Sequence, residues 1–169
     1  MSGASRYLFV ALLLIVALLQ ATFLPQLKIL GVKPELMLLS VLSWSLLRGA
    51  EEGLVWAFLG GLMLDLFSGG PLGASTLALL AVSFISGLIE PAVAHTSFLL
   101  PLVVALGGTL LYQGLFLSVV QLTRGTVLWG NSLFQVTLPS LAVNTLFMPV
   151  VFQALAWLDR KTSRPEIRW

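Results

Sequence analysis

The sequence predicts an all-α integral membrane protein, a bundle of six transmembrane helices that forms one domain of 169 residues. Two observations support this fold class. Hydrophobic residues make up 58% of the chain and charged residues only 9%, whereas a typical soluble domain is about one quarter charged. The charged side chains also gather between long apolar runs, as they do in proteins that cross a bilayer several times.

The first transmembrane helix is expected at residues 7–24, an apolar run that follows Arg6 and ends at Pro25. A helix needs roughly 20 apolar residues to cross the hydrocarbon core, and this run is long enough. A secretory signal peptide is the alternative for a run in this position. The sequence Leu19-Gln20-Ala21 lacks the small-x-small pattern of a cleavage site, so an uncleaved first helix is the preferred interpretation.

The second and third helices are expected at residues 35–48 and 53–67, with a tight polar turn at 49–53 between them. Pro34 precedes the second run, and proline suits the first turn of a helix. This second run is short for a full crossing. A short or partly re-entrant element is therefore an open alternative.

The last three helices and the tail are expected at residues 72–89, 98–122, 132–158 and 159–169. Pro139 and Pro149 lie within the sixth run and predict a tilt or kink there. The distribution of basic residues then predicts the orientation, because cytoplasmic loops are enriched in Lys and Arg. With six crossings and a cytoplasmic amino terminus, the basic residues inside are Arg6, Arg48, Arg160, Lys161, Arg164 and Arg168, and those outside are Lys28, Lys33 and Arg124. Both termini are therefore expected in the cytoplasm.

Asp65 is the one acid placed well within an apolar run. It can lie in interfacial water or cap the following glycine-rich turn, it can contact a partner or substrate, or it can relay protons. The sequence leaves these three roles open. Gly53, Ala57 and Gly61 recur every four residues before it, and small residues at this spacing let helix backbones approach closely in lipid.

Several function classes find no support in the sequence. The net charge of +2 and the absence of a basic stripe argue against nucleic-acid binding. A chain without cysteine forms no disulfide, Cys-ligated zinc site or iron–sulfur cluster. The single histidine, His95, is expected in a solvated loop. Glu51 and Glu52 are explained as acids at a helix start, so no catalytic residues, no metal site and no cofactor are expected.

Other polar and aromatic residues have structural explanations. Gln20, Gln113 and Asn144 lie within apolar runs, where interhelical hydrogen bonds are their expected role. Trp44 and Trp56 fall near predicted helix ends and are expected to anchor the chain at the membrane interface.

Four short motifs carry a resemblance to a known family. They are Lys33-Pro-Glu-Leu36, Leu47-Arg-Gly49, Gly60-Gly-Leu-Met-Leu-Asp65 and Ser68-Gly-Gly-Pro-Leu-Gly73. In this order and spacing, over residues 33–73, the chain resembles the rod shape-determining protein MreD family. Glu35 stands where the family pattern more often has Asp, which preserves the charge.

The resemblance implies a non-catalytic scaffold in the cytoplasmic (inner) membrane of a bacterium, a subunit of the elongation machinery that controls cell shape. The expected partners are MreC above all, and also MreB, RodA and a class B penicillin-binding transpeptidase, which together position peptidoglycan synthesis. The family is also similar in fold to the six-helix substrate-binding subunits of energy-coupling-factor transporters. The alternative function is therefore substrate binding in a vitamin-type transporter.

The residues expected to matter most come from the matched motifs. The expected structural and partner-binding centre is Gly60, Gly61, Asp65, Gly70, Pro71 and Gly73. Gly53 and Ala57 are expected to pack helices together, and Pro34 and Glu35 to begin the second helix.

Overall fold

The computed structural model of the chain describes residues 3–26, 31–89, 99–125 and 133–162. Over these residues the chain is all-helical and contains no strand, which confirms the all-α part of the predicted fold class, whereas the six crossings stay a prediction. The six helices are α1 (Gly3–Leu18), α2 (Leu36–Arg48), α3 (Ala50–Ser68), α4 (Ala74–Gly87), α6 (Leu99–Arg124) and α8 (Leu138–Thr162). A π-helical turn extends α1 over Leu19–Phe23, and another precedes α8 over Leu133–Thr137.

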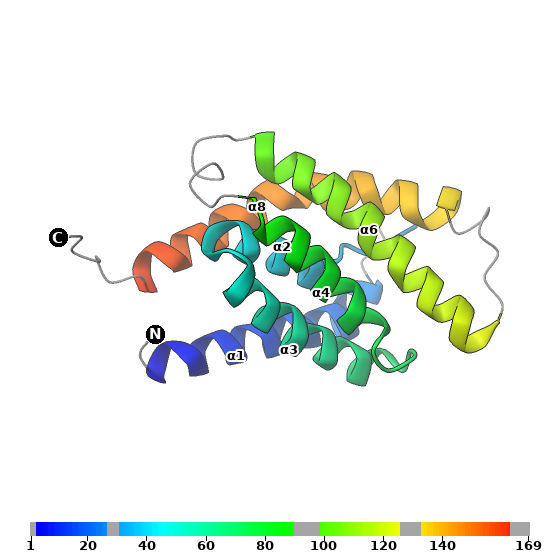
Figure 1. Cartoon of the computed structure of the whole chain (residues 1–169), viewed down its shortest axis with the longest axis horizontal. Coiled ribbons are helices and arrows are strands. Elements are labelled where there is room, and N and C mark those ends of the chain that lie inside the picture. Colours follow the sequence, from blue (N-terminus) through cyan, green and yellow to red (C-terminus); the bar gives the residue numbers. More distant parts are fainter. Residues whose placement is uncertain (1–2, 27–30, 90–98, 126–132, 163–169) are drawn as a thin grey trace.

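The short helix α2 lies at the centre of the bundle. It packs against α3, α4, α6 and α8 (Figure 1). Every residue from Met37 to Leu47 is buried, including three serines. A helix that is apolar on all sides belongs in the interior of a structure, and this pattern explains the position of α2.

The outer surface of the bundle is apolar as well. Large hydrophobic side chains are widely exposed on it, among them Ile15 of α1, Leu66 of α3 and Leu146 of α8. Exposed apolar surface on this scale indicates a membrane environment. Three helical segments are long and apolar enough to cross a bilayer: Phe9–Gln26, Leu99–Thr123 and Phe134–Lys161.

Helix α2 is about 20 Å long at 1.5 Å per residue, shorter than a hydrocarbon core of about 30 Å. Its first turn is capped by side chains from distant helices. The backbone N–H of Met37 donates to Gln20 Oε1 at 2.7 Å, and that of Glu35 donates to Asn144 Oδ1 at 3.0 Å. Backbone that starts a helix inside a membrane needs such partners, and here the surrounding bundle supplies them.

The connection between α2 and α3 is tighter than expected. The predicted polar turn at 49–53 shrinks to Gly49, which has a φ of 84°, because Glu51 and Glu52 already belong to the first turn of α3. Glycine adopts this left-handed conformation without steric cost. Likewise α8 runs on to Thr162, so residues 159–162 of the predicted tail are helical.

The beginning of α1 and the end of α8 lie at the same end of the bundle (Figure 1). We call this the terminal end. The α2–α3 connection is also here, since Arg48 forms an ion pair with Asp159 near the end of α8. The α3–α4 turn lies at the opposite end.

Candidate functional site

Asp65 lies at the opposite end of the bundle, three residues before α3 ends, and is 2% exposed. Its carboxylate accepts four hydrogen bonds from the start of α4. The donors are the backbone N–H groups of Gly73 (2.9 Å), Ser75 (2.9 Å) and Thr76 (3.1 Å) and the hydroxyl of Thr76 (2.7 Å). We call this arrangement the Asp65 cap.

The cap replaces the local one that α4 lacks. The residue before α4 is Gly73, which has no side chain to accept the free N–H groups of the first turn. A carboxylate at a helix amino terminus satisfies those donors and also interacts favourably with the helix dipole. Asp65 thereby joins the end of α3 to the beginning of α4.

The α3–α4 turn depends on two glycines in the left-handed region, Gly69 with a φ of 62° and Gly73 with a φ of 92°. Between them, Pro71 accepts a hydrogen bond from the N–H of Ala74 at 3.2 Å. Gly70 lies partly exposed in the same turn, where its N–H is 3.4 Å from the Ser68 hydroxyl. Gly70, Pro71 and Gly73 are thus brought next to the Asp65 cap.

The small residues of α3 face the inside of the bundle. Gly53, Ala57, Gly60 and Gly61 are all buried. A Cβ atom at Gly60 would lie 2.6 Å from Met37 Sδ of α2, and one at Gly61 would lie 2.5 Å from the Cα of Thr76 of α4. These glycines allow α3 to approach α2 and α4 closely. The face of α3 that carries them is therefore covered by α2 and α4.

Glu35 anchors the start of α2 at the depth of the middle of α6. Its Oε1 accepts a hydrogen bond from Gln113 Nε2 at 2.7 Å, and its Oε2 accepts one from Asn144 Nδ2 at 3.2 Å. Asn144 also donates to the Thr109 hydroxyl at 3.3 Å. We call these four residues the Glu35 cluster. Pro34 is buried just before it.

The expected interhelical hydrogen bonds of Gln20, Gln113 and Asn144 are confirmed. Their partners were not predictable from sequence, because Gln113 and Asn144 lie 78 and 109 residues from Glu35. The only signal for them was their polarity within apolar runs.

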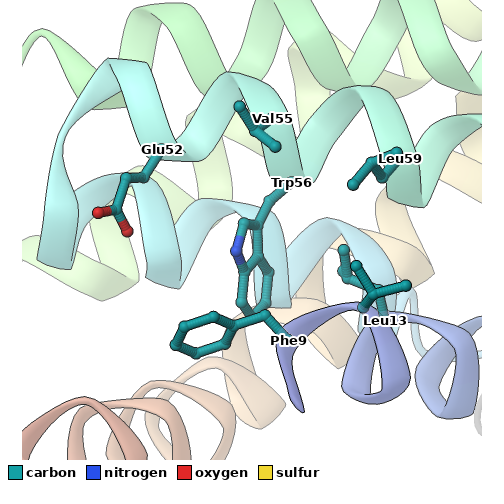
Figure 2. Close-up of a pocket in the computed structure, with 7 residues that line it drawn as sticks. Phe9, Leu13, Glu52, Val55, Trp56 and Leu59 are labelled. Atoms are coloured by element: carbon teal, nitrogen blue, oxygen red, sulfur yellow. The ribbon is translucent and has the colours of Figure 1, made fainter. Parts of the chain in front are cut away.

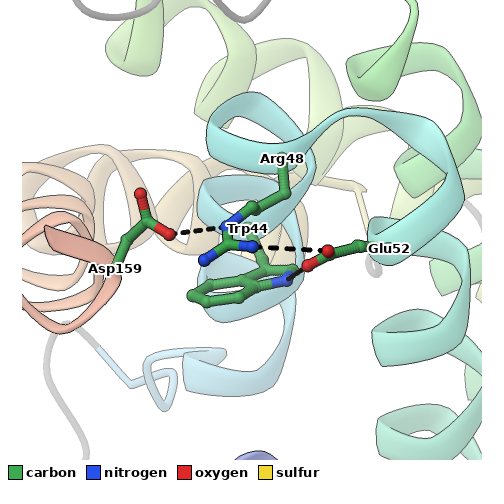
Figure 3. A network of polar contacts seen from close by, with 4 residues as sticks. All are labelled: Trp44, Arg48, Glu52 and Asp159. Atoms are coloured by element: carbon green, nitrogen blue, oxygen red, sulfur yellow. Dashed lines mark hydrogen bonds and ion pairs between the residues drawn. The ribbon is translucent and has the colours of Figure 1, made fainter. Parts of the chain in front are cut away.

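A second polar network lies at the terminal end (Figure 3). Arg48 Nε donates to Asp159 Oδ1 at 2.5 Å, and Arg48 Nη1 lies 3.4 Å from Glu52 Oε1. Glu52 Oε2 also accepts a hydrogen bond from Trp44 Nε1 at 3.2 Å. This network joins the ends of α2 and α8 to the start of α3, and the sequence interpretation missed it.

The predicted role of Trp44 and Trp56 as interface anchors is wrong, because their exposed fractions are only 0% and 4%. The two indoles stack with centroids 4.4 Å apart, and Phe9 of α1 packs against both. Both tryptophans lie near the ends of neighbouring helices, which suggested interface anchors, but their rings stack against each other inside the bundle.

Beside this aromatic cluster, α1 and α3 leave an open groove of about 370 Å³ (Figure 2). We call it the α1–α3 groove. It is lined by Phe9, Val10, Leu13, Glu52, Val55, Trp56 and Leu59. All of these side chains are apolar except Glu52, which lies at one end.

Two further predictions concern His95 and metal binding. His95 lies outside the described residues. Among the residues that are described, no group of three or more His, Asp or Glu side chains lies close enough together to hold a metal ion.

Together, the apolar outer surface, the three helices able to cross a bilayer and the polar contacts turned inward define an all-α membrane protein. The family model of the rod shape-determining protein MreD matches residues 3–157 of the chain. The chain therefore belongs to the MreD family, a membrane family of structural shape-determining proteins, and has a role in rod shape determination. No curated protein and no solved structure matches it.

Proposed function

We propose that the protein is a non-catalytic scaffold subunit of the bacterial elongation complex, which binds MreC and helps to position peptidoglycan synthesis. The observation that carries this proposal is the family match over residues 3–157, nearly the whole chain. RodA, MreB and a class B penicillin-binding transpeptidase are further proposed members of the same assembly.

The polar side chains described above bind other parts of the same chain, and this favours a scaffold. The Asp65 cap, the Glu35 cluster and the Arg48 network each bind one helix to another. Such contacts hold a fixed outer surface, and a rigid surface loses less conformational entropy when a partner binds.

We also propose that the terminal end faces the cytoplasm of a multi-pass inner-membrane protein. In the described part of the chain, Arg6, Arg48, Arg160 and Lys161 lie along the helices at this end, whereas Arg124 ends α6 at the opposite end and Lys33 precedes α2. Cytoplasmic ends are enriched in Lys and Arg. The Asp65 cap would then lie toward the outer side of the membrane.

In this proposal Asp65 acts on partners through the shape of the α3–α4 turn. Its carboxylate is buried and engaged by the turn itself. Leu66, just before the turn, and Leu72, within it, are 63% and 72% exposed and are available to a partner.

The test is recovery of MreC with the tagged full-length protein, purified in mild detergent from its native membrane. We expect MreC in stoichiometric amount with the unaltered protein. We expect about tenfold less with Asp65→Ala, which corresponds to a loss of about 1.4 kcal/mol in binding. The amount of the variant in the membrane should change by less than about twofold, because membrane insertion depends on the apolar helices.

Asp65→Asn is the matched control, since its side-chain oxygen can still accept from the turn, and it should retain most of the MreC. Undiminished MreC with Asp65→Ala would refute the role of the turn. A transport ATPase or a tightly held vitamin in place of cell-wall proteins would instead favour the transporter subunit.

A further inference from the structure

Resting on the proposed function for the existence of a membrane partner, we propose that the α1–α3 groove is the docking site for a single transmembrane helix of that partner. The occupant is an apolar helix that carries a Lys or Arg at its cytoplasmic end, next to Glu51 and Glu52. This assigns both a surface and a chemistry to the interaction.

The buried face of α3 is not available to such a partner. Gly53 packs against Ser45 and Ser83, Gly60 against Met37, and Gly61 against Thr76. The small-residue stripe of α3 is therefore consumed by α2 and α4. A partner helix must use another face, and the opposite side of α3 borders the groove.

The groove has a rigid floor and exposed rims. Phe9, Leu13 and Trp56 form the floor, with exposed fractions of 4%, 1% and 4%. Val10 on α1 and Val55 on α3 form the two rims, 43% and 57% exposed. Figure 2 shows Glu52 at one end and Leu13 and Leu59 toward the other.

Packing contacts drive helix association in lipid, because the lipid removes the hydrophobic driving force. A floor that is already ordered favours such contacts. The rings of Phe9, Trp44 and Trp56 lie against one another with centroids 4.4 to 5.7 Å apart. Because Trp44 is hydrogen-bonded to Glu52, the aromatic floor is also tied to the polar end of the groove.

The charge at the end of the groove distinguishes a protein helix from lipid. Glu51 is exposed, and Glu52 is partly exposed beside it in the first turn of α3. Glu52 is paired with Arg48, so Glu51 is the acid whose charge disfavours an anionic lipid headgroup beside the groove and attracts the basic residues that flank most transmembrane helices on the cytoplasmic side. Glu52 already accepts bonds from Trp44 and Arg48, but a carboxylate has about four acceptor positions.

A second groove, between α6 and α8, provides a comparison. It is lined by Leu102, Leu106, Ala142, Thr145, Leu146 and Pro149. Its volume of about 380 Å³ is similar, but no acidic side chain lines it. Lipid can fill such a groove without electrostatic cost, so it supplies control positions.

The first experiment is photocrosslinking in native membranes with the full chain. Benzoylphenylalanine replaces Val55 at the groove. In separate control variants it replaces Leu146 at the second groove, or Val103 on the surface of α6 outside that groove, and these side chains are 73% and 63% exposed. All three positions are on the surface, so the probe is tolerated in the fold. We expect the Val55 probe to capture a single-span protein, identified by mass spectrometry, at least tenfold more than the controls capture it.

The second experiment tests the charge. Glu51→Lys, combined with the probe at Val55, should reduce the captured protein about fivefold or more, since one nearby charge is worth about 1 kcal/mol at the membrane surface. Lys161→Glu is the control of opposite sign, because it changes the charge by two units in the other direction at the same end but on α8, and it should leave capture from Val55 undiminished. Exchanging the basic residue of the captured partner for Glu should restore capture by Glu51→Lys.

Equal capture from all three positions, capture of lipid alone, or capture of a second copy of this chain from Val55 would overturn the proposal. Unchanged capture with Glu51→Lys would overturn its electrostatic part. The proposed function fails separately. If MreC is recovered but crosslinks only from Val103 or Leu146, the scaffold stands and the groove is refuted. If Val55 captures another single-span protein with a basic end, and MreC is not recovered with the purified protein, the groove stands and MreC binding is refuted.

Discussion

Asp65 and Glu35 are two carboxylates within one apolar bundle. Asp65 caps the start of α4 from the end of α3, and Glu35 precedes α2, but their partners come from very different distances along the chain. The Asp65 cap uses donors 8 to 11 residues away. The Glu35 cluster uses amides 78 and 109 residues away. The first is a local connection between α3 and α4, and the second joins α2 to α6 and α8.

This difference teaches how a short apolar helix can start in the middle of a membrane domain. The cap of α4 is Asp65 of the preceding helix, so the α3–α4 pair can satisfy its own polar groups. Helix α2 depends on Gln20 and Asn144 for its first N–H groups, and these side chains arrive only when the bundle is assembled. Local contacts also cost less loop-closure entropy than distant ones.

The strongest way to break the comparison is to remove the local cap. Asp65→Ala leaves the N–H groups of Gly73, Ser75 and Thr76 without their acceptor, and hydrogen bonds to a charged group are worth about 1.5–3 kcal/mol each. We expect the free energy of unfolding to fall by about 3 kcal/mol. Denaturant titration of the purified protein in detergent measures this change. A variant as stable as the unaltered chain would show that water can replace the carboxylate.

A double-mutant cycle separates the long-range cluster from the local cap. Glu35→Ala and Asn144→Ala should each lower the free energy of unfolding by about 2 kcal/mol, because each leaves buried partners unsatisfied. Together they should cost about 1 kcal/mol less than the sum, since the two residues share hydrogen bonds. Asp65→Ala and Asn144→Ala share no partner and should add within about 0.5 kcal/mol. Coupling in the second pair as strong as in the first would contradict the separation of the two regions.

The smallest changes in the free energy of unfolding are expected at two adjacent glycines of α3, one of which faces α2 and the other α4. A Cβ at Gly61 meets the backbone of Thr76, next to the Asp65 cap, whereas one at Gly60 meets the flexible end of Met37. We expect Gly61→Ala to lower the free energy of unfolding by about 1.5 kcal/mol, within the usual cost of overpacking. Gly60→Ala should cost less than about 1 kcal/mol, because Met can change rotamer. The same titration ranks them, and the reverse order would mean that α4 yields more easily than Met37.

Much of the fold was predictable because it depends on features that are close together in sequence. Apolar runs, prolines and glycines indicated helices near the observed ones, and the membrane class followed from composition. Gly69 to Gly73 and Asp65 lie within one short segment, so a glycine-rich turn beside a carboxylate was visible in the sequence. The exact bounds were less predictable, since Glu51 and Glu52 belong to α3, which begins at Ala50.

The sequence by itself determined the all-helical membrane class, the family resemblance and the position of Asp65 next to its turn, because each depends on composition or on neighbouring residues. The tertiary structure alone decided which polar groups meet across the bundle, that Trp44 and Trp56 point inward, and that α1 and α3 leave a groove ending at Glu52. In a chain that is apolar on every side, hydrophobic periodicity does not distinguish lipid from protein. Which helix faces contact lipid and which contact protein is therefore decided by the packing of the helices against one another.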